Sequence, residues 1–285
     1  MKLVSFRHDG KDGFGAVVDG GIVNLSGTML YETLYEDVTA VLAGGAVGDL
    51  SKALVGARPD LGVDDISFLM PVPRPGKIMC VGRNYRAYHE VMEEGKTPKW
   101  PSIFGRFASS FVPHGEPIVK PRESEQLDYE GELAVVIGRR GRHIPEAEAL
   151  SYVGGYTVMN EGSARDWQNR GTQNCPAKNF WHSGSIGPWL VTADEVPDPS
   201  KLHITTRVNG QMRQDGGTDM MIFGIPFVIA HVSRFTWLEP GDIIATGSPG
   251  GSAIEMKPPA WLVPGDTLEV EIGGIGTLAN PIVAE

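Results

Sequence analysis

The stretch LDYEGELAVVI, residues 127–137, contains two carboxylates separated by one glycine and followed directly by an uninterrupted apolar run. A short apolar run of this kind predicts a buried β-strand. Alternate side chains of a strand project from the same face, so Glu130 and Glu132 would converge with Cα atoms about 6.6 Å apart. Carboxylates in such a pair repel each other unless solvent or a cation screens them, and oxygen ligands suit Mg2+ or Mn2+. The alternative is a solvated edge strand, where acidic pairs at this spacing are common.

A second strand, predicted over residues 156–159, ends next to Glu161. Strand ends are where open sheets present ligand-binding side chains, so Glu161 is the candidate for a third metal-binding carboxylate. Asp166 follows at the start of a predicted helix, where a negative charge is favoured by the helix dipole. The spacing does not decide the role of Gln168.

The overall composition excludes several classes of protein. The 285 residues, 41% hydrophobic and with a formal net charge of -10, favour a globular protein that binds neither nucleic acid nor an anionic membrane surface. Two cysteines, Cys80 and Cys175, lie outside any metal-binding spacing, so we expect no disulfide scaffold or zinc site. The longest apolar stretch, residues 220–232, is too short to span a membrane, and the N-terminus lacks a signal-peptide pattern. We therefore expect a cytoplasmic protein.

The pattern along the chain predicts an α+β fold that is mainly β. The proline-rich segment PVPRPG, residues 71–76, interrupts regular structure, so we expect a small N-terminal α+β domain over residues 1–70 and a catalytic domain over residues 71–285. Strands are predicted over residues 2–7, 14–18, 22–25, 77–82, 132–137, 156–159, 189–192, 203–208, 242–246 and 267–272. Helices are predicted within residues 28–54 and over residues 146–150, 164–169 and 222–235.

Three further features could carry chemistry. Lys178 lies in the segment PAKNF, and Ser248 lies in the glycine-rich segment TGSPGG, which could bind a carboxylate through backbone N–H groups. The alternative for Lys178 is an ordinary surface charge, and the alternative for the glycine-rich segment is a simple turn. His89 follows a predicted buried strand and has acids nearby, including Glu93, that could orient its imidazole as a general base. The motifs typical of serine hydrolases, zinc proteases and dinucleotide-binding enzymes are absent from the sequence.

Taken together, these segments resemble the fumarylacetoacetate hydrolase family from residue 77 to residue 281. The resemblance rests on motifs that occur in the family's order: CVGRNY (80–85), DYEGE (128–132), SARD (163–166), Lys178, NG (209–210), M-x-IF (220–223), PGD (240–242) and TGSP (246–249). It implies a mixed β-roll, usually dimeric, with a small N-terminal domain of the kind that many bacterial members carry. It also implies a Mg2+, Mn2+ or Ca2+ ion bound by three acids.

The resemblance assigns roles residue by residue. Glu130 and Glu132 match two metal ligands, and Glu161 stands where most members have Asp, which makes the third ligand one methylene longer. Lys178 matches a lysine that contacts substrate oxygens and is assigned a catalytic role. The residues assigned to the substrate pocket are Arg83, Tyr85, Arg106, Gln168 and Ser248.

One departure from the family pattern concerns water activation. Hydrolytic members have a His–Glu pair at the positions occupied here by Tyr88 and Val91. His89 is displaced by one residue, so we assign it as the catalytic base with Glu93 as its orienting acid.

The leading functional hypothesis is a metal-dependent hydrolase that cleaves a carbon–carbon bond of a 2,4-dioxo acid, an acylpyruvate-like compound, in aromatic catabolism. Bound metal would chelate the 2-oxo acid end and stabilise the departing enolate. The first alternative is an oxaloacetate decarboxylase or a dioxo-acid tautomerase or isomerase, which needs the same enolate but no attacking water. The second is a non-catalytic protein that binds an oxo acid. The expected assembly is a homodimer.

Overall fold

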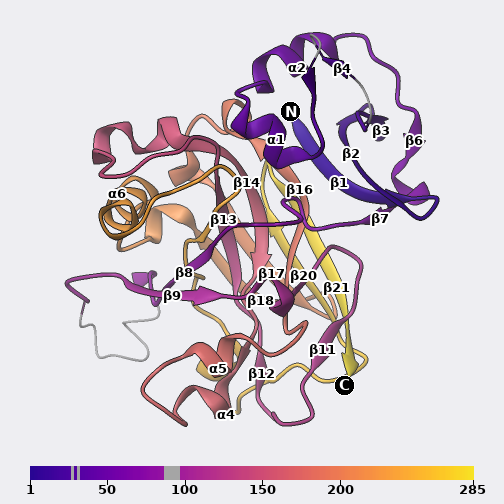
Figure 1. The fold of residues 1–285 in the computed structure, drawn as a ribbon. Coiled ribbons are helices and arrows are strands. Elements are labelled where there is room, and N and C mark those ends of the chain that lie inside the picture. Colours follow the sequence, from indigo (N-terminus) through magenta and orange to yellow (C-terminus); the bar gives the residue numbers. More distant parts are fainter. Residues whose placement is uncertain (27–28, 31–32, 87–96) are drawn as a thin grey trace.

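A large sheet extends through the whole molecule (Figure 1). The computed structural model describes residues 1–26, 29–30, 33–86 and 97–285. Within them the large sheet has twelve strands. In spatial order these are β6 (Leu61–Gly62), β3 (Gly21–Asn24), β2 (Lys11–Val18), β1 (Lys2–His8), β16 (Gly184–Thr192), β14 (Val153–Asn160), β13 (Gly131–Ile137), β19 (Ile243–Ala245), β8 (Ile78–Gly82) and β9 (Ser102–Arg106), with β7 (Ser67–Phe68) paired to β1 and β10 (Phe111–Val112) paired to β16.

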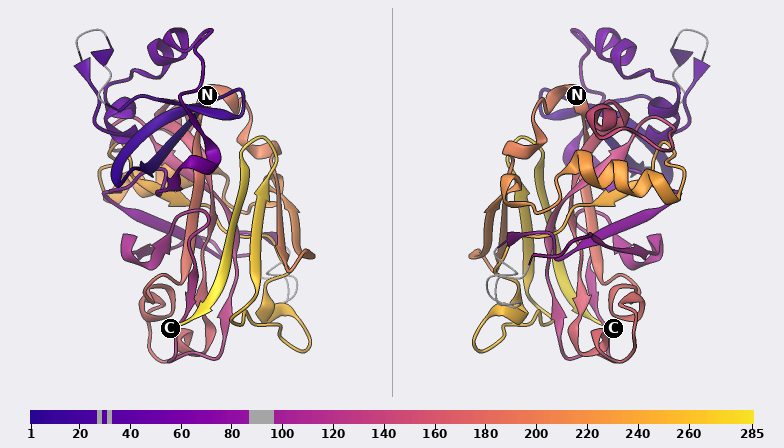
Figure 2. Two further views of the ribbon diagram at one scale, coloured as in Figure 1. Left: turned by 90° about the vertical axis from the view of Figure 1, so that its right-hand side faces the viewer. Right: turned by 90° about the vertical axis from the view of Figure 1, so that its left-hand side faces the viewer.

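A second sheet packs against one face of β13, β14 and β16, as the side views in Figure 2 show. Its strands, in spatial order, are β11 (Ile118–Lys120), β21 (Gly276–Ala284), β20 (Thr267–Ile272), β17 (His203–Val208) and β18 (Gln211–Gly217). Two small ribbons complete the strands: β12 (Leu127–Asp128) with β15 (Ser163–Ala164), and β4 (Met29–Leu30) with β5 (Thr33–Leu34).

The helices of the described residues are short and lie outside the sheets. The α-helices are α1 (Val38–Ala43), α2 (Val47–Ala53), α4 (Arg165–Gln168), α5 (Cys175–Lys178) and α6 (Ile225–Phe235). The 3-10 helices are η1 (Val63–Asp65), η2 (Ala108–Ser110), η3 (Glu146–Tyr152), η4 (Ala193–Glu195), η5 (Pro199–Lys201), η6 (Thr218–Met220) and η7 (Ala253–Glu255). No helix in this part of the chain is long and apolar enough to cross a membrane. The mainly β architecture agrees with the prediction from the sequence.

Residues 133–137 of strand β13 are all apolar because both faces of the strand are buried. Leu133, Val135 and Ile137 pack into a core shared with α6 and the second sheet, whereas Ala134 and Val136 pack into a core on the other face. β13 is hydrogen-bonded on both edges, to β14 and to β19. The strand therefore forms a rigid, central support for the residues at its N-terminal end.

The sheet continues across the predicted domain boundary. β1 pairs with β16 through Lys2↔Val191 and Leu3↔Leu190. Leu3 and Phe14 share one buried core with Ala134 on β13. The first 70 residues are thus joined to the remainder by strand pairing and by apolar packing, and the division at residue 71 stays a prediction.

Candidate metal and substrate site

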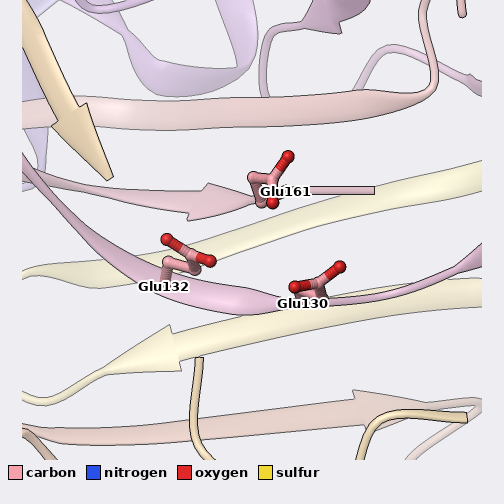
Figure 3. A group of neighbouring side chains, drawn as sticks. All are labelled: Glu130, Glu132 and Glu161. Atoms are coloured by element: carbon pink, nitrogen blue, oxygen red, sulfur yellow. The ribbon is translucent and has the colours of Figure 1, made fainter. Parts of the chain in front are cut away.

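Three carboxylates meet where β13 begins and β14 ends (Figure 3). The two strands are antiparallel, and the Glu161 N–H donates to the Glu130 carbonyl at 2.8 Å, which sets the ends of the strands side by side. Ligand oxygens of Glu130, Glu132 and Glu161 all lie within 4.8 Å of one another. Glu132 is only 2% exposed and Glu161 only 1%. The alternative of a solvated edge strand is therefore wrong.

Cationic side chains surround two of these carboxylates. Lys178 Nζ lies 2.9 Å from Glu130 Oε1 and also donates to Glu161 Oε2. Arg165 Nη2 lies 3.0 Å from Glu130 Oε1, and Arg106 Nη1 lies 3.0 Å from Glu161 Oε1. Burial raises the pKa of Glu130, but Arg165 and Lys178 outweigh it and lower that pKa to about 2. Lys178 has a raised pKa despite its burial, because both carboxylates favour its charged form.

Glu132 is the least compensated of the three carboxylates. Its Oε2 accepts the Gly247 N–H at 2.8 Å, and among the described residues it forms no ion pair with a lysine or arginine. Burial raises its pKa well above the usual range, and the charges of Glu161 and Glu130 raise it further. A cation close to Glu132 would remove this penalty.

The donor set fits a hard divalent cation. It consists of carboxylate oxygens, which suit Mg2+ and Mn2+ rather than soft metals. The nearby Cys80 is buried, and burial raises the pKa of its thiol, so it offers no thiolate. Glu130, Glu132 and Glu161 are therefore the residues that would hold the ion, as the sequence predicted.

A cavity of about 40 Å³, enough for a few water molecules, opens in front of the carboxylates. It includes Arg83, Gln168 and Ser248 among its lining residues, in agreement with their assignment to the pocket. The full lining is Gly82, Arg83, Ser102, Phe104, Glu130, Glu132, Arg165, Gln168, Asn174, Lys178, Ser248, Ser252 and Glu255.

Two residues assigned to the pocket lie elsewhere. The Arg106 side chain is fully buried behind Glu161, where it also donates to the Gly162 carbonyl at 3.1 Å. Tyr85 is 0% exposed and belongs to the core between the two sheets, where its hydroxyl has no hydrogen-bond partner among the described residues. Neither residue is among those that line the cavity. The proposed base His89 and its partner Glu93 lie outside the described residues.

Sequence reasoning assigned no role to Asp128 and Arg165, which support the site. The buried Asp128 accepts from Arg165 Nε at 2.8 Å and from the Ala253 N–H at 2.7 Å. Arg165 in turn contacts Glu130 and donates from Nη1 to Gln168 Oε1 at 3.3 Å. The available signal was their position, because Asp128 lies two residues before Glu130 and Arg165 lies four after Glu161.

Comparison with known proteins accords with this geometry. Residues 77–283 match the family model described as fumarylacetoacetate (FAA) hydrolase, C-terminal. The chain belongs to the fumarylacetoacetate hydrolase family. One similar relative is the human protein named oxaloacetate tautomerase FAHD2A, mitochondrial, which is 41% identical over 99% of this chain and 92% of its own length.

Solved structures of the fumarylacetoacetate hydrolase family share the fold. Fumarylacetoacetate hydrolase from the psychrophilic Exiguobacterium antarcticum superimposes with a TM-score of 0.80 at 33% identity, covering all of both chains. Maleylpyruvate hydrolase from Sphingobium sp. SYK-6, solved with manganese(II) and pyruvate, gives a TM-score of 0.81 at 28% identity and covers 100% of this chain and 99% of its own. The predicted family and its mainly β fold are thus confirmed.

The family includes both tautomerases and hydrolases that act on small oxo acids. The sequence patterns favour hydrolysis, whereas the human relative's name favours the tautomerase alternative. The expected homodimer and the expected cytoplasmic location stay predictions, although the human relative's name places that protein in mitochondria.

Proposed function

We propose that this protein is a divalent-metal-dependent tautomerase that interconverts the keto and enol forms of oxaloacetate. The observation that carries the proposal is the cluster of Glu130, Glu132 and Glu161 at the base of a cavity, where Lys178 bridges Glu130 and Glu161. Substantial identity to oxaloacetate tautomerases, over nearly the whole chain, supports this substrate.

The balance of buried charge favours a dianionic substrate only when a metal is bound. Four carboxylates face three cationic side chains: Asp128, Glu130, Glu132 and Glu161 against Arg106, Arg165 and Lys178. This cluster therefore has one excess negative charge, and a divalent ion reverses its sign. The metal-loaded cluster therefore attracts anions.

Each polar side chain has a distinct task in this proposal. Glu130, Glu132 and Glu161 would hold Mg2+ or Mn2+, which polarises a 2-oxo group when bound. Lys178 stays protonated at neutral pH because its pKa is raised, so its Nζ donates to the enolate oxygen rather than acting as a base. Gln168 and Ser248 offer uncharged hydrogen-bonding groups to the carboxylates of the substrate.

Tautomerisation requires less of the site than hydrolysis does. The net change is the shift of one proton between C3 and the oxygen on C2, while no water attacks and no bond between heavy atoms breaks. The reaction therefore does not need the His–Glu pair that hydrolytic relatives carry and that this sequence replaces with Tyr88 and Val91. This departure favours tautomerisation over hydrolysis.

Hydrolysis of an acylpyruvate is the second candidate. It is supported by the likeness to maleylpyruvate hydrolase and needs the same stabilised enolate. It requires a base for water as well, a role that the sequence assigns to His89 with Glu93.

The deciding experiment compares the reactions on one preparation of enzyme. Metal-stripped protein is reloaded with Mg2+ or Mn2+, and the decay of the ultraviolet absorbance of enol-oxaloacetate is followed against buffer with the same free metal. Pyruvate release is measured in parallel with oxaloacetate and a panel of acylpyruvates. Metal-dependent decay without pyruvate is expected. Pyruvate formation from an acylpyruvate would replace this proposal with hydrolysis, and pyruvate from oxaloacetate would replace it with decarboxylation.

Lys178→Met tests the role of the lysine separately from that of the metal. The variant removes the donor to the enolate oxygen and also a cation that competes for Glu130 and Glu161. We expect kcat to fall by about a hundredfold or more, while affinity for Mn2+ is retained or increased. Lys120→Met, which removes a lysine paired with Glu125 outside the cavity, is the matched control. Near-normal kcat in Lys178→Met would contradict the assignment.

A further inference from the structure

The cavity residue Ser248 is flanked by two residues whose backbone groups form hydrogen bonds with buried side chains. Gly247, immediately before it, donates its N–H to Glu132 Oε2 at 2.8 Å. Pro249, immediately after it, accepts at its carbonyl from Gln214 Nε2 at 2.7 Å. Ser248 is therefore fixed on one side by a candidate metal ligand and on the other by Gln214.

Gln214 connects this loop to the strand that carries the metal ligands. Its side chain is fully buried on β18, and its Oε1 accepts the Gly131 N–H at 2.9 Å, between Glu130 and Glu132. One amide thus spans from the middle of the carboxylate pair to the residue after Ser248. Both ends of the amide are satisfied, which is the arrangement that holds a buried polar group in one conformation.

Glycines let the loop lie directly on β18. A Cβ on Gly251 would come within 2.1 Å of the Arg213 carbonyl, and a Cβ on Gly216 within 2.7 Å of Pro249 Cβ. The loop therefore packs closely against β18 at these two glycines. Gln214 itself does not line the cavity within the described part of the chain, so any effect on substrate must act through this loop.

We propose that Gln214 is a positioning residue that holds Ser248 in register with Glu130 and Glu132, and thereby sets the affinity of the metal-loaded site for the carboxylate of an oxo acid. The inference rests on the proposed function only in taking an oxo acid as the ligand. Displacing a binding group by about 1 Å is enough to lose much of its contribution, so a buried residue behind it can determine affinity.

The test measures metal and ligand affinity separately. Mn2+ binding is titrated first, and oxalate, an inert analogue of a 2-oxo acid, is then titrated into the Mn2+-loaded protein. Gln214→Met keeps the side-chain length and removes both hydrogen bonds, whereas Gln214→Asn keeps the amide but is one methylene too short to span both partners. Gln211→Met, at an exposed glutamine on the same strand, is the matched control.

We expect both Gln214 variants to bind Mn2+ within threefold of the parent and oxalate at least tenfold more weakly. With enol-oxaloacetate, KM should rise by a similar factor while kcat changes less than threefold. A purely structural role would instead lower the two affinities together or change only the thermal midpoint.

Several outcomes would overturn the inference: unchanged oxalate affinity in both variants, equal losses of Mn2+ and oxalate binding, failure of both variants to fold, or a Mn2+-loaded parent that does not bind oxalate. The proposed function fails differently. A parent that binds oxalate in a Gln214-dependent manner but does not accelerate tautomerisation would refute the tautomerase and leave the inference standing.

Discussion

Among the three clustered carboxylates, Glu132 has the fewest compensating contacts in the described residues. A carboxylate in this position destabilises the metal-free protein, because burial and the two neighbouring acids oppose its charge. Proteins retain such groups where function requires them, and the function proposed for Glu132 is to bind a cation.

The first prediction concerns Glu132→Gln in the metal-free protein. The pKa of Glu132 is raised above its ordinary value of 4.5, so its favourable contribution is complete below that pH and is lost as pH rises through the higher folded-state pKa. At neutral pH the variant should therefore have a higher free energy of unfolding than the parent. Urea unfolding in EDTA over a series of pH values measures this gain.

Metal addition should reverse the order of stability. Mn2+ at about a hundred times its dissociation constant raises the free energy of unfolding of a protein that binds it by about 2.7 kcal/mol. The Glu132→Gln variant should be stabilised by Mn2+ much less than the parent. Glu148→Gln on the exposed turn η3 is the control. Equal stabilisation of Glu132→Gln and the parent by Mn2+ would exclude Glu132 as a ligand.

At the scale of residues, sequence patterns predicted the clustering of the carboxylates better than the side chains around them. The spacing of Glu130 and Glu132 fixes a shared face on any strand, and that prediction is confirmed. Arg106 and Tyr85 show the limit, because a sequence does not reveal whether a polar side chain lies in front of a carboxylate or behind it. That depends on the packing of β9 and on the core between the sheets.

At the scale of elements, β13 lies exceptionally close to the second sheet. A Cβ on Gly131 would come within 2.3 Å of Thr206 Oγ1 and 2.9 Å of Val270 Cγ1. This close approach also allows the Gly131 N–H to reach Gln214. The glycine between the two glutamates is thus required by packing between the sheets.

The second prediction follows from this contact. Gly131→Ala should lower the free energy of unfolding by about 1–3 kcal/mol, the usual cost of overpacking, and should weaken Mn2+ binding because the strand must move. Gly48→Ala is the control, since Gly48 lies in α2 with open space around its Cα, and should instead stabilise by about 0.5–1 kcal/mol. Urea midpoints and a Mn2+ titration measure both effects. Parental stability of Gly131→Ala would show that the sheets can separate freely.

Strands with regular alternation were predictable, and strands with atypical residues were not. β17 and β20 occupy the residues that their patterns indicated. β18 has the sequence QMRQDGG, which is rich in residues that strands disfavour, and β21 contains Pro281. Both strands form because neighbouring strands supply hydrogen-bonding partners, which local sequence does not report.

At the scale of the whole molecule, the N-terminal strands and the β-roll meet around His114. Its ring contacts Phe68 of β7 edge to face, with centroids 4.8 Å apart, and its Nδ1 accepts the Ala279 N–H of β21 at 3.1 Å. The proline-rich segment indicated a boundary between two units, but a sequence pattern could not reveal that one sheet and a shared core continue across it.

The last prediction is a pH dependence at this junction. Burial lowers the pKa of His114 below its ordinary value of 6.5, so the folded state favours the neutral ring whose Nδ1 accepts from Ala279. The unfolded state binds the proton more readily, so this contribution is present above pH 6.5 and is lost as pH falls towards the folded-state pKa. We expect the free energy of unfolding to decrease between pH 7 and pH 5 in urea titrations.

His114→Asn separates this residue from the other titrating groups, because the amide oxygen can accept the same N–H without taking up a proton. Its unfolding free energy should therefore fall less steeply over that pH range than the parent's. His203→Asn, at an exposed histidine on β17, should leave the slope of the parent more nearly intact than His114→Asn does, because its ring is not buried at the junction. An identical slope in the parent and His114→Asn would mean that the junction does not distinguish a neutral ring from a charged one, and that the contact with β21 contributes nothing to the pH dependence of folding.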